Sequence, residues 1–218
     1  NRMASSPSRA ADQIAPTARR TVLSLDHVSR SFGEGEQRVD AIVDVSLGVN
    51  PGAFAAVMGP SGSGKSTLLG LAGGLDQPTA GTVSVCGEPL GGMPRDDLAR
   101  VRRRQLGFVF QDYNLVPTLT AVENVSLPLE LDGVSAIRAR KAAEIALDRV
   151  GVPELVDRHI EEMSGGQRQA IAIARAVIVR PEVLVADEPV TVDGSTQALT
   201  MDVLSDGSGA WPRLQVRD

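Results

Sequence analysis

The sequence predicts an α/β fold built on a parallel sheet, with a helical segment inserted between two of the strands. Runs of consecutive apolar residues at 54–58, 106–110 and 183–186 are typical of strands that are buried on both faces. Helical patterns border these runs, and helical periodicity extends from residue 118 to about residue 162. We therefore expect a parallel core that is interrupted by a helical insert near residues 112–163.

The elements before the first buried strand are predicted to be half-buried strands. Ordered structure is expected to begin at Thr21, where apolar and polar residues start to alternate. Residues 1–20 are rich in Ser, Ala, Pro and Arg and lack the apolar segment of a secretory signal. We interpret those residues as a disordered leader. Alternation of apolar and polar residues at 21–25 and 41–49 predicts two strands. After the apolar run, residues 66–72 predict a helix.

The later elements follow from the same kinds of pattern. Residues 81–87 predict a strand with turn residues at each end, and residues 96–105 predict a helix whose four arginines form a solvated face. Residues 137–150 are the clearest amphipathic stretch. A helix over 167–179 is expected to stop before Pro181.

Composition limits the classes of function. The 218 residues, 42% hydrophobic and 22% charged, suit one sizeable globular domain. A net charge of −5 disfavours nucleic acid as the main partner. A single cysteine, Cys86, excludes an internal disulfide framework and fits a reducing compartment. No apolar run reaches the length of a membrane span, so any role at a membrane is expected to depend on another chain.

The glycine-rich loop after the first buried strand fits the phosphate-binding pattern G-x-x-x-x-G-K-S/T. Its glycines let the backbone approach an anionic ligand, and the helix that follows directs its positive end at phosphates. Lys65 is expected to reach the β- and γ-phosphates of ATP, and the Ser66 hydroxyl to ligate Mg²⁺. The predicted ATP-binding residues of this loop are Gly59, Pro60, Ser61, Gly62, Ser63, Gly64, Lys65, Ser66 and Thr67.

Two acidic residues, Asp187 and Glu188, follow the apolar strand 183–186. By itself, such a pair is more often the start of an exposed loop. Downstream of a phosphate-binding loop, we expect Asp187 to hold Mg²⁺ through water and Glu188 to act as the general base that takes a proton from the attacking water.

The string Ser164-Gly165-Gly166-Gln167, placed between the phosphate-binding loop and the Asp-Glu strand, narrows the class of nucleotide-binding protein. Together these motifs resemble the ATP-binding cassette (ABC) ATPases over residues 21–193. The resemblance implies a P-loop NTPase core of the RecA-like type with a parallel sheet. It also implies an N-terminal antiparallel β subdomain and an inserted α-helical subdomain, followed here by a divergent tail at residues 194–218.

The resemblance also implies roles for particular residues. Ser164, Gly165, Gly166 and Gln167 would form the signature loop, which contacts the γ-phosphate held by a second ABC ATPase subunit, so that ATP lies between two chains. Gln111 matches the glutamine that touches Mg²⁺ or the attacking water and senses the membrane partner. Phe32 matches the aromatic residue that stacks on adenine, although a single aromatic there is equally well explained by packing.

Local sequence is similar to the subfamily of lipoprotein-release, macrolide-exporter and cell-division ABC ATPases. The similar segments are residues 59–69, 107–111, 113–117 and 123–128. This similarity implies a homodimer that is cytoplasmic and peripheral at the inner face of the cell membrane, bound there through an integral-membrane permease. The surface near Tyr113–Glu123 would receive the permease's coupling helix.

The sequence departs from the family's pattern in three places. Ala170 replaces a usual arginine, and the segment from Asp187 to Asp193 is one residue shorter than the family's D-loop. The residues after Asp193 contain no histidine to serve as the family's switch, and we interpret them as a truncated or frame-shifted end with a possible helix over 197–204. We expect slow turnover and an exposed apolar edge of the sheet.

Three functions remain open from the sequence. The first is an ATPase subunit of an ABC exporter or mechanotransmission complex. The second is a catalytically impaired nucleotide-binding remnant, favoured by the missing histidine and the short D-loop, and opposed by Lys65, Asp187 and Glu188. The third is a soluble ABC ATPase of DNA repair or translation, which the single cassette and the acidic charge disfavour.

Overall fold

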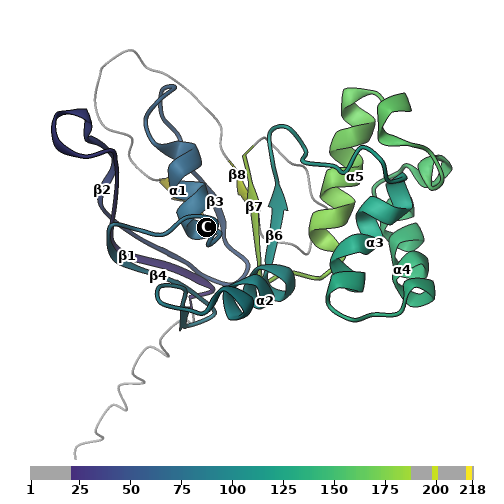
Figure 1. The fold of residues 1–218 in the computed structure, drawn as a ribbon, viewed down its shortest axis with the longest axis horizontal. Helices are drawn as coiled ribbons and strands as arrows, with labels where there is room; N and C mark the ends of the chain where they lie inside the picture. The colour runs from purple at the N-terminus through teal and green to yellow at the C-terminus, as the bar shows by residue number, and fades with distance from the viewer. Residues whose placement is uncertain (1–20, 188–197, 201–214, 218) are drawn as a thin grey trace, which may run out of the picture.

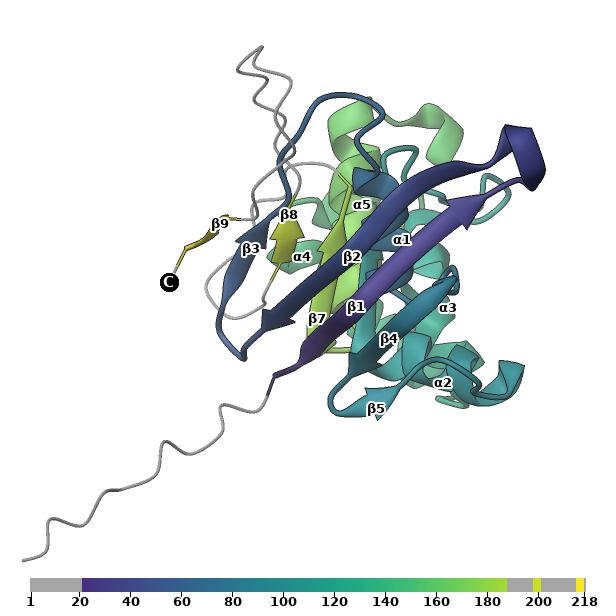
Figure 2. The same cartoon turned by 90° about the vertical axis from the view of Figure 1, so that its left-hand side faces the viewer.

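A computed structural model describes residues 21–187, 198–200 and 215–217 as two sheets, a helix between them and a layer of helices at one side (Figures 1 and 2). The first sheet has the strand order β2-β1-β4-β5, and the second has the order β6-β7-β8-β3-β9. Helix α1 lies between the two sheets, and α3, α4 and α5 form the side layer (Figure 1). This architecture confirms the predicted α/β fold class.

The first sheet is antiparallel, as the family resemblance implies for the N-terminal β subdomain. Strand β1 (Leu23–Phe32) pairs with β2 (Val39–Val49) on one side and with β4 (Ala80–Val85) on the other, and β4 continues to β5 (Glu88–Pro89). The short 3₁₀ helix η1 (Gly35–Gln37) connects β1 to β2.

The second sheet is parallel from β6 to β3. Strand β6 (Leu106–Val109) pairs with β7 (Val183–Ala186), and β8 (Ala198–Thr200) lies between β7 and β3 (Phe54–Ala56). Strand β9 (Gln215–Arg217) adds to the outer side of β3 in antiparallel orientation. β3 ends two residues earlier than expected, and its Phe54 is 47% exposed rather than buried.

One expectation about the tail is wrong at its described residues. The helix expected over 197–204 is instead a strand at β8, because this segment pairs with a strand on both of its sides. Strand β9 forms one edge of this sheet, next to β3, and the expected exposure of an apolar edge stays a prediction. Long-range pairing overrides local preference here, and local sequence could not predict it.

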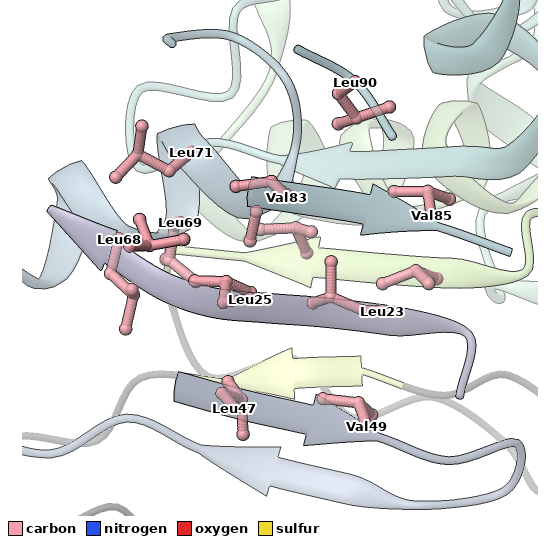
Figure 3. Packing of buried hydrophobic residues seen from close by; sticks show 14 of the residues in the cluster. Leu23, Leu25, Leu47, Val49, Leu68, Leu69, Leu71, Val83, Val85 and Leu90 are labelled. Carbon is pink, nitrogen blue, oxygen red and sulfur yellow. The ribbon is translucent and has the colours of Figure 1, made fainter. Parts of the chain in front are cut away.

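The largest apolar core lies between the antiparallel sheet and α1 (Lys65–Ala72). Leu68, Leu69 and Leu71 of α1 pack against inward-facing residues of β1, β2 and β4 (Figure 3). Each fully buried leucine contributes about 2 kcal/mol by removing apolar surface from water. This packing fixes the helix that follows the glycine-rich loop. Helix α2 (Arg95–Gln105) adds Val101 to the same core.

The helical layer has its own core. Helices α3 (Ala121–Leu131), α4 (Ala136–Arg149) and α5 (Gly165–Val177) pack together with the short helices η2 (Pro153–Leu155) and η3 (Ile160–Glu162). Helix α5 contributes to two cores, because Ile171 and Ala174 face α3 and α4 while Ala172 and Ala176 pack with β6 and β7. α5 therefore connects the helical layer to the parallel sheet.

Within the described ranges, every helix is too short or too polar to cross a membrane.

Candidate functional site

The glycine-rich loop connects β3 to α1, and its backbone needs glycine at two points. Gly62 and Gly64 have φ angles of +78° and +87°, in the region where glycine is favoured. A Cβ atom on Gly64 would lie 2.3 Å from the carbonyl oxygen of Ala41, so this position also lacks space for a side chain. The loop is therefore held against β2.

Lys65 folds back over the loop. Its Nζ donates hydrogen bonds to the carbonyl oxygens of Gly59 at 2.9 Å and of Pro60 at 2.7 Å. The ammonium group and the N-terminus of α1 thus belong to the same short segment, and both attract anions. Pro60, Ser61 and Ser66 of this segment are exposed.

Ser66 and Asp187 are 121 positions apart in the sequence and adjacent in the structure. The Ser66 Oγ lies 3.5 Å from Asp187 Oδ1. The Asp187 backbone N–H donates to the Val109 carbonyl at 3.0 Å, which extends the β6–β7 ladder and sets Asp187 at the carboxyl end of β7. A hydroxyl and a carboxylate are oxygen donors of the kind that Mg²⁺ prefers, so these residues fit the metal. Glu188 lies outside the described residues.

Gln111 follows β6 at the same edge of the sheet. The parallel register pairs Val109 with Ala186, so the residues after β6 and after β7 leave the sheet together. Gln111 is exposed and opens a turn, and the turn residues Tyr113 and Asn114 have positive φ angles of 59° and 44°.

The signature string forms the start of α5. Ser164 is the N-cap: its Oγ accepts a hydrogen bond from the Gln167 backbone N–H at 3.3 Å, and Gln167 Oε1 accepts one from the Ser164 N–H at 2.9 Å. Added Cβ atoms on Gly165 and Gly166 would meet no atom within 4 Å. The string therefore presents an open helix N-terminus. It belongs to the helical layer, on the other side of β6 and β7 from α1 (Figure 1).

Phe32 ends β1 with 43% of its surface exposed. The Arg30 guanidinium lies 4.5 Å from the centre of the ring, and Arg30 Nε is 2.9 Å from a carboxylate oxygen of Asp76. One face of the ring is thus covered by a cation that is held in place by an ion pair.

A cavity of about 430 Å³ lies beside the glycine-rich loop. Its walls on β2 carry apolar residues that an alternating strand pattern already explains, so the sequence alone did not predict them as part of a site. The cavity is lined by Ala41, Ile42, Val43, Val45, Val57, Met58, Ser63, Gly64, Lys65 and Leu68.

Asn124, which no sequence motif marks, fixes the segment between Gln111 and α3. It is completely buried, and it accepts a hydrogen bond from the Val116 N–H and donates to the carbonyls of Val116, Leu119 and Thr120. Thr120 caps α3 through Glu123, whose pKa is lowered chiefly by the hydrogen bond from the Thr120 backbone.

Comparison with known proteins gives concordant results. The sequence model of the family described as ABC transporter matches residues 42–191. The macrolide export ATP-binding/permease protein MacB of Marinobacter nauticus is 42% identical over 188 residues, which are 86% of this chain but only 29% of MacB. The ABC transporter ATP-binding protein YknY of Bacillus subtilis is 39% identical over 182 residues, which are 83% of this chain and 79% of YknY.

A solved structure of the ATP-binding cassette MJ0796, dimeric and bound to ADP and Pi, has the same fold. Its TM-score is 0.76 at 33% identity, and the match covers 85% of this chain and 95% of that chain. The family match extends over more than half of the sequence, and the strand–loop–helix geometry of Gly59–Ser66 agrees with it. The chain belongs to the ABC transporter family.

Proposed function

We propose that this chain binds Mg²⁺-ATP at the glycine-rich loop and hydrolyses it. The observation that carries the proposal is the approach of Ser66 to Asp187, since it brings two oxygen ligands together at the start of α1. Residues 59–67 then bind the phosphates, and Phe32 stacks on adenine with its uncovered face.

Each residue of the site has a proposed role in ATP binding or hydrolysis. Lys65 exchanges its bonds to the Gly59 and Pro60 carbonyls for bonds to the β- and γ-phosphates, and the new bonds are stronger because both partners are charged. Ser66 and Asp187 would hold Mg²⁺, which would supply neutralisation of phosphate charge. Gln111 orients the attacking water, and Glu188 accepts its proton.

Two copies of the chain complete each site in this proposal. Ser164–Gln167 lies in the helical layer, away from α1 of the same chain, and presents an open helix N-terminus. We propose that this N-terminus contacts the γ-phosphate bound by a second copy. The structure of MJ0796 with ADP and Pi is dimeric, which supports the arrangement.

The work of hydrolysis is proposed to drive a membrane permease. MacB is named as an ATP-binding/permease protein, and this chain matches 29% of its length. A cavity of about 420 Å³ beside Asn114 is lined by residues of α2, β6, α3 and α5. The segment Tyr113–Glu123 borders it, and we propose it as the docking surface for the permease, which would hold the chain at the inner face of the cell membrane.

The test is Mg²⁺-ATP hydrolysis by the purified chain beside Lys65→Ala and Glu188→Gln, with nucleotide binding measured in the same samples. We expect turnover that both substitutions abolish, and binding that Lys65→Ala weakens and Glu188→Gln preserves. Binding without turnover in the unsubstituted chain would favour the second candidate, a nucleotide-binding remnant, to which the shortened Asp187–Asp193 segment already points. No binding would refute both.

A further inference from the structure

Arg175 joins the signature helix to the turn that follows β6. It lies in the last turn of α5. Its Nη1 donates to the Asn114 carbonyl at 2.6 Å, and its Nη2 donates to the Tyr113 carbonyl at 2.6 Å. A guanidinium is planar and rigid, so one side chain fixes two consecutive carbonyls at once.

The turn needs such a contact. Tyr113 and Asn114 both have positive φ angles, which cost Tyr113 about 1 kcal/mol and Asn114 less, because asparagine adopts this region more readily. Within the turn, the Tyr113 N–H donates to Phe110 and the Asn114 N–H to Asp112. Arg175 donates the hydrogen bonds that the carbonyls of Tyr113 and Asn114 accept. Without the Arg175 side chain, the turn would be free to relax.

Partial burial of Arg175 removes water from its guanidinium and so disfavours the charged form. This desolvation lowers the pKa of Arg175. None of the ion pairs formed among the described residues includes Arg175. Its charge is compensated by the two carbonyls and by solvent in the cavity beside Asn114, which Arg175 also lines. A leucine or methionine could fill the same space without this desolvation cost.

The turn that Arg175 holds begins with Gln111. Because β6 and β7 are parallel and in register, this turn leaves the sheet at the edge where Asp187 meets Ser66. A displacement of the turn relative to α5 therefore changes where Gln111 stands relative to that pair.

We propose that Arg175 is a positioning residue for Gln111. It locks the Gln111–Asn114 turn to the helix that begins with the signature loop, and it acts on the phosphate site only through that turn. This inference rests on the proposed function for the role of Gln111, but the locking of the turn is independent of nucleotide.

The first arm of the test measures the lock without nucleotide. Hydrogen–deuterium exchange is compared in the full chain, Arg175→Ala, Arg175→Lys and the control Arg102→Ala. Arg102 also donates to a backbone carbonyl, that of Gly74, but from α2. We expect exchange of peptides covering 111–116 to rise about tenfold in Arg175→Ala and less in Arg175→Lys, with no local change in Arg102→Ala. Unchanged exchange in both Arg175 variants overturns the proposal, and the Lys variant keeps the test decisive if the Ala variant does not fold.

The second arm measures the consequence. We expect Arg175→Ala to lower kcat about tenfold or more while nucleotide affinity stays within about twofold, and the double variant with Gln111→Ala to lose no more than Gln111→Ala alone. Losses that multiply would mean that Arg175 does not act through Gln111 and would overturn the proposal. If exchange is faster in Arg175→Ala but the unsubstituted chain shows no turnover, the proposed function is refuted, and the inference that Arg175 holds the turn still stands.

Discussion

Replacement of Asn124 by alanine is predicted to destabilise the chain by about 3 kcal/mol. The side chain has no exposed surface and forms four hydrogen bonds, all to backbone groups of residues 116–120. After the substitution, Thr120 still accepts from the residue 124 N–H, and Val116 still accepts from the Leu119 N–H. The Val116 N–H and the Leu119 carbonyl, both on half-buried residues, lose the hydrogen bonds that satisfy them, and each such group costs about 1–2 kcal/mol.

The assay is urea unfolding followed by far-UV circular dichroism, with Ser126→Ala as the matched control on the same helix. Ser126 is also buried but forms two bonds, and one of them is to the carboxylate of Glu130, which can turn to water. We expect about 1 kcal/mol for this control. If Asn124→Ala cost no more than Ser126→Ala, the reasoning that the buried amide holds the segment would be refuted.

Two further predictions concern backbone space and pH. Gly64→Ala is expected to lower the melting temperature more than Gly62→Ala. An alanine would be strained by the positive φ angle at either position, but only at position 64 would its Cβ also meet the Ala41 carbonyl. Equal effects in differential scanning calorimetry would contradict this. The exposed His27 Nδ1 lies 2.6 Å from Asp44 Oδ1, and this contact raises the pKa of His27. The stabilisation is fully present below pH 6.5, the unfolded value, and is lost as pH rises through the folded pKa. The melting-temperature difference between the chain and His27→Gln should therefore shrink with rising pH; a difference that grew would have the wrong sign.

The sequence was sufficient for the parts of the site whose chemistry is local. The Gly59–Ser66 loop is readable because phosphate binding needs glycine, lysine and a hydroxyl at fixed spacing, and strand 183–186 places Asp187 at a sheet edge. The parallel pairing of β7 with β8 and of β8 with β3 sets the carboxyl ends of β7 and β3 at the same edge, where Asp187 lies beside Ser66.

The contacts that hold the site's surroundings could not be predicted in the same way. Arg175 bonds carbonyls 61 and 62 positions away, and an arginine in an amphipathic helix is ordinarily assigned to the solvated face. Asn124 has the same difficulty, because its partners are backbone groups that carry no sequence signature. Strand β8 was predicted as part of a helix, since its pairing with β7 and β3 leaves no local pattern.

The proposed function requires that the glycine-rich loop and the Ser66–Asp187 pair bind ATP together with Mg²⁺. The most direct measurement is ATP affinity by titration calorimetry, with Mg²⁺ and with a chelator, for the full chain, Lys65→Ala and Ser66→Ala. We predict that Lys65→Ala weakens binding about tenfold or more under both conditions, because a charge-assisted bond is lost. Ser66→Ala should remove the part of the affinity that depends on Mg²⁺. Equal affinity in all three chains would contradict the claim.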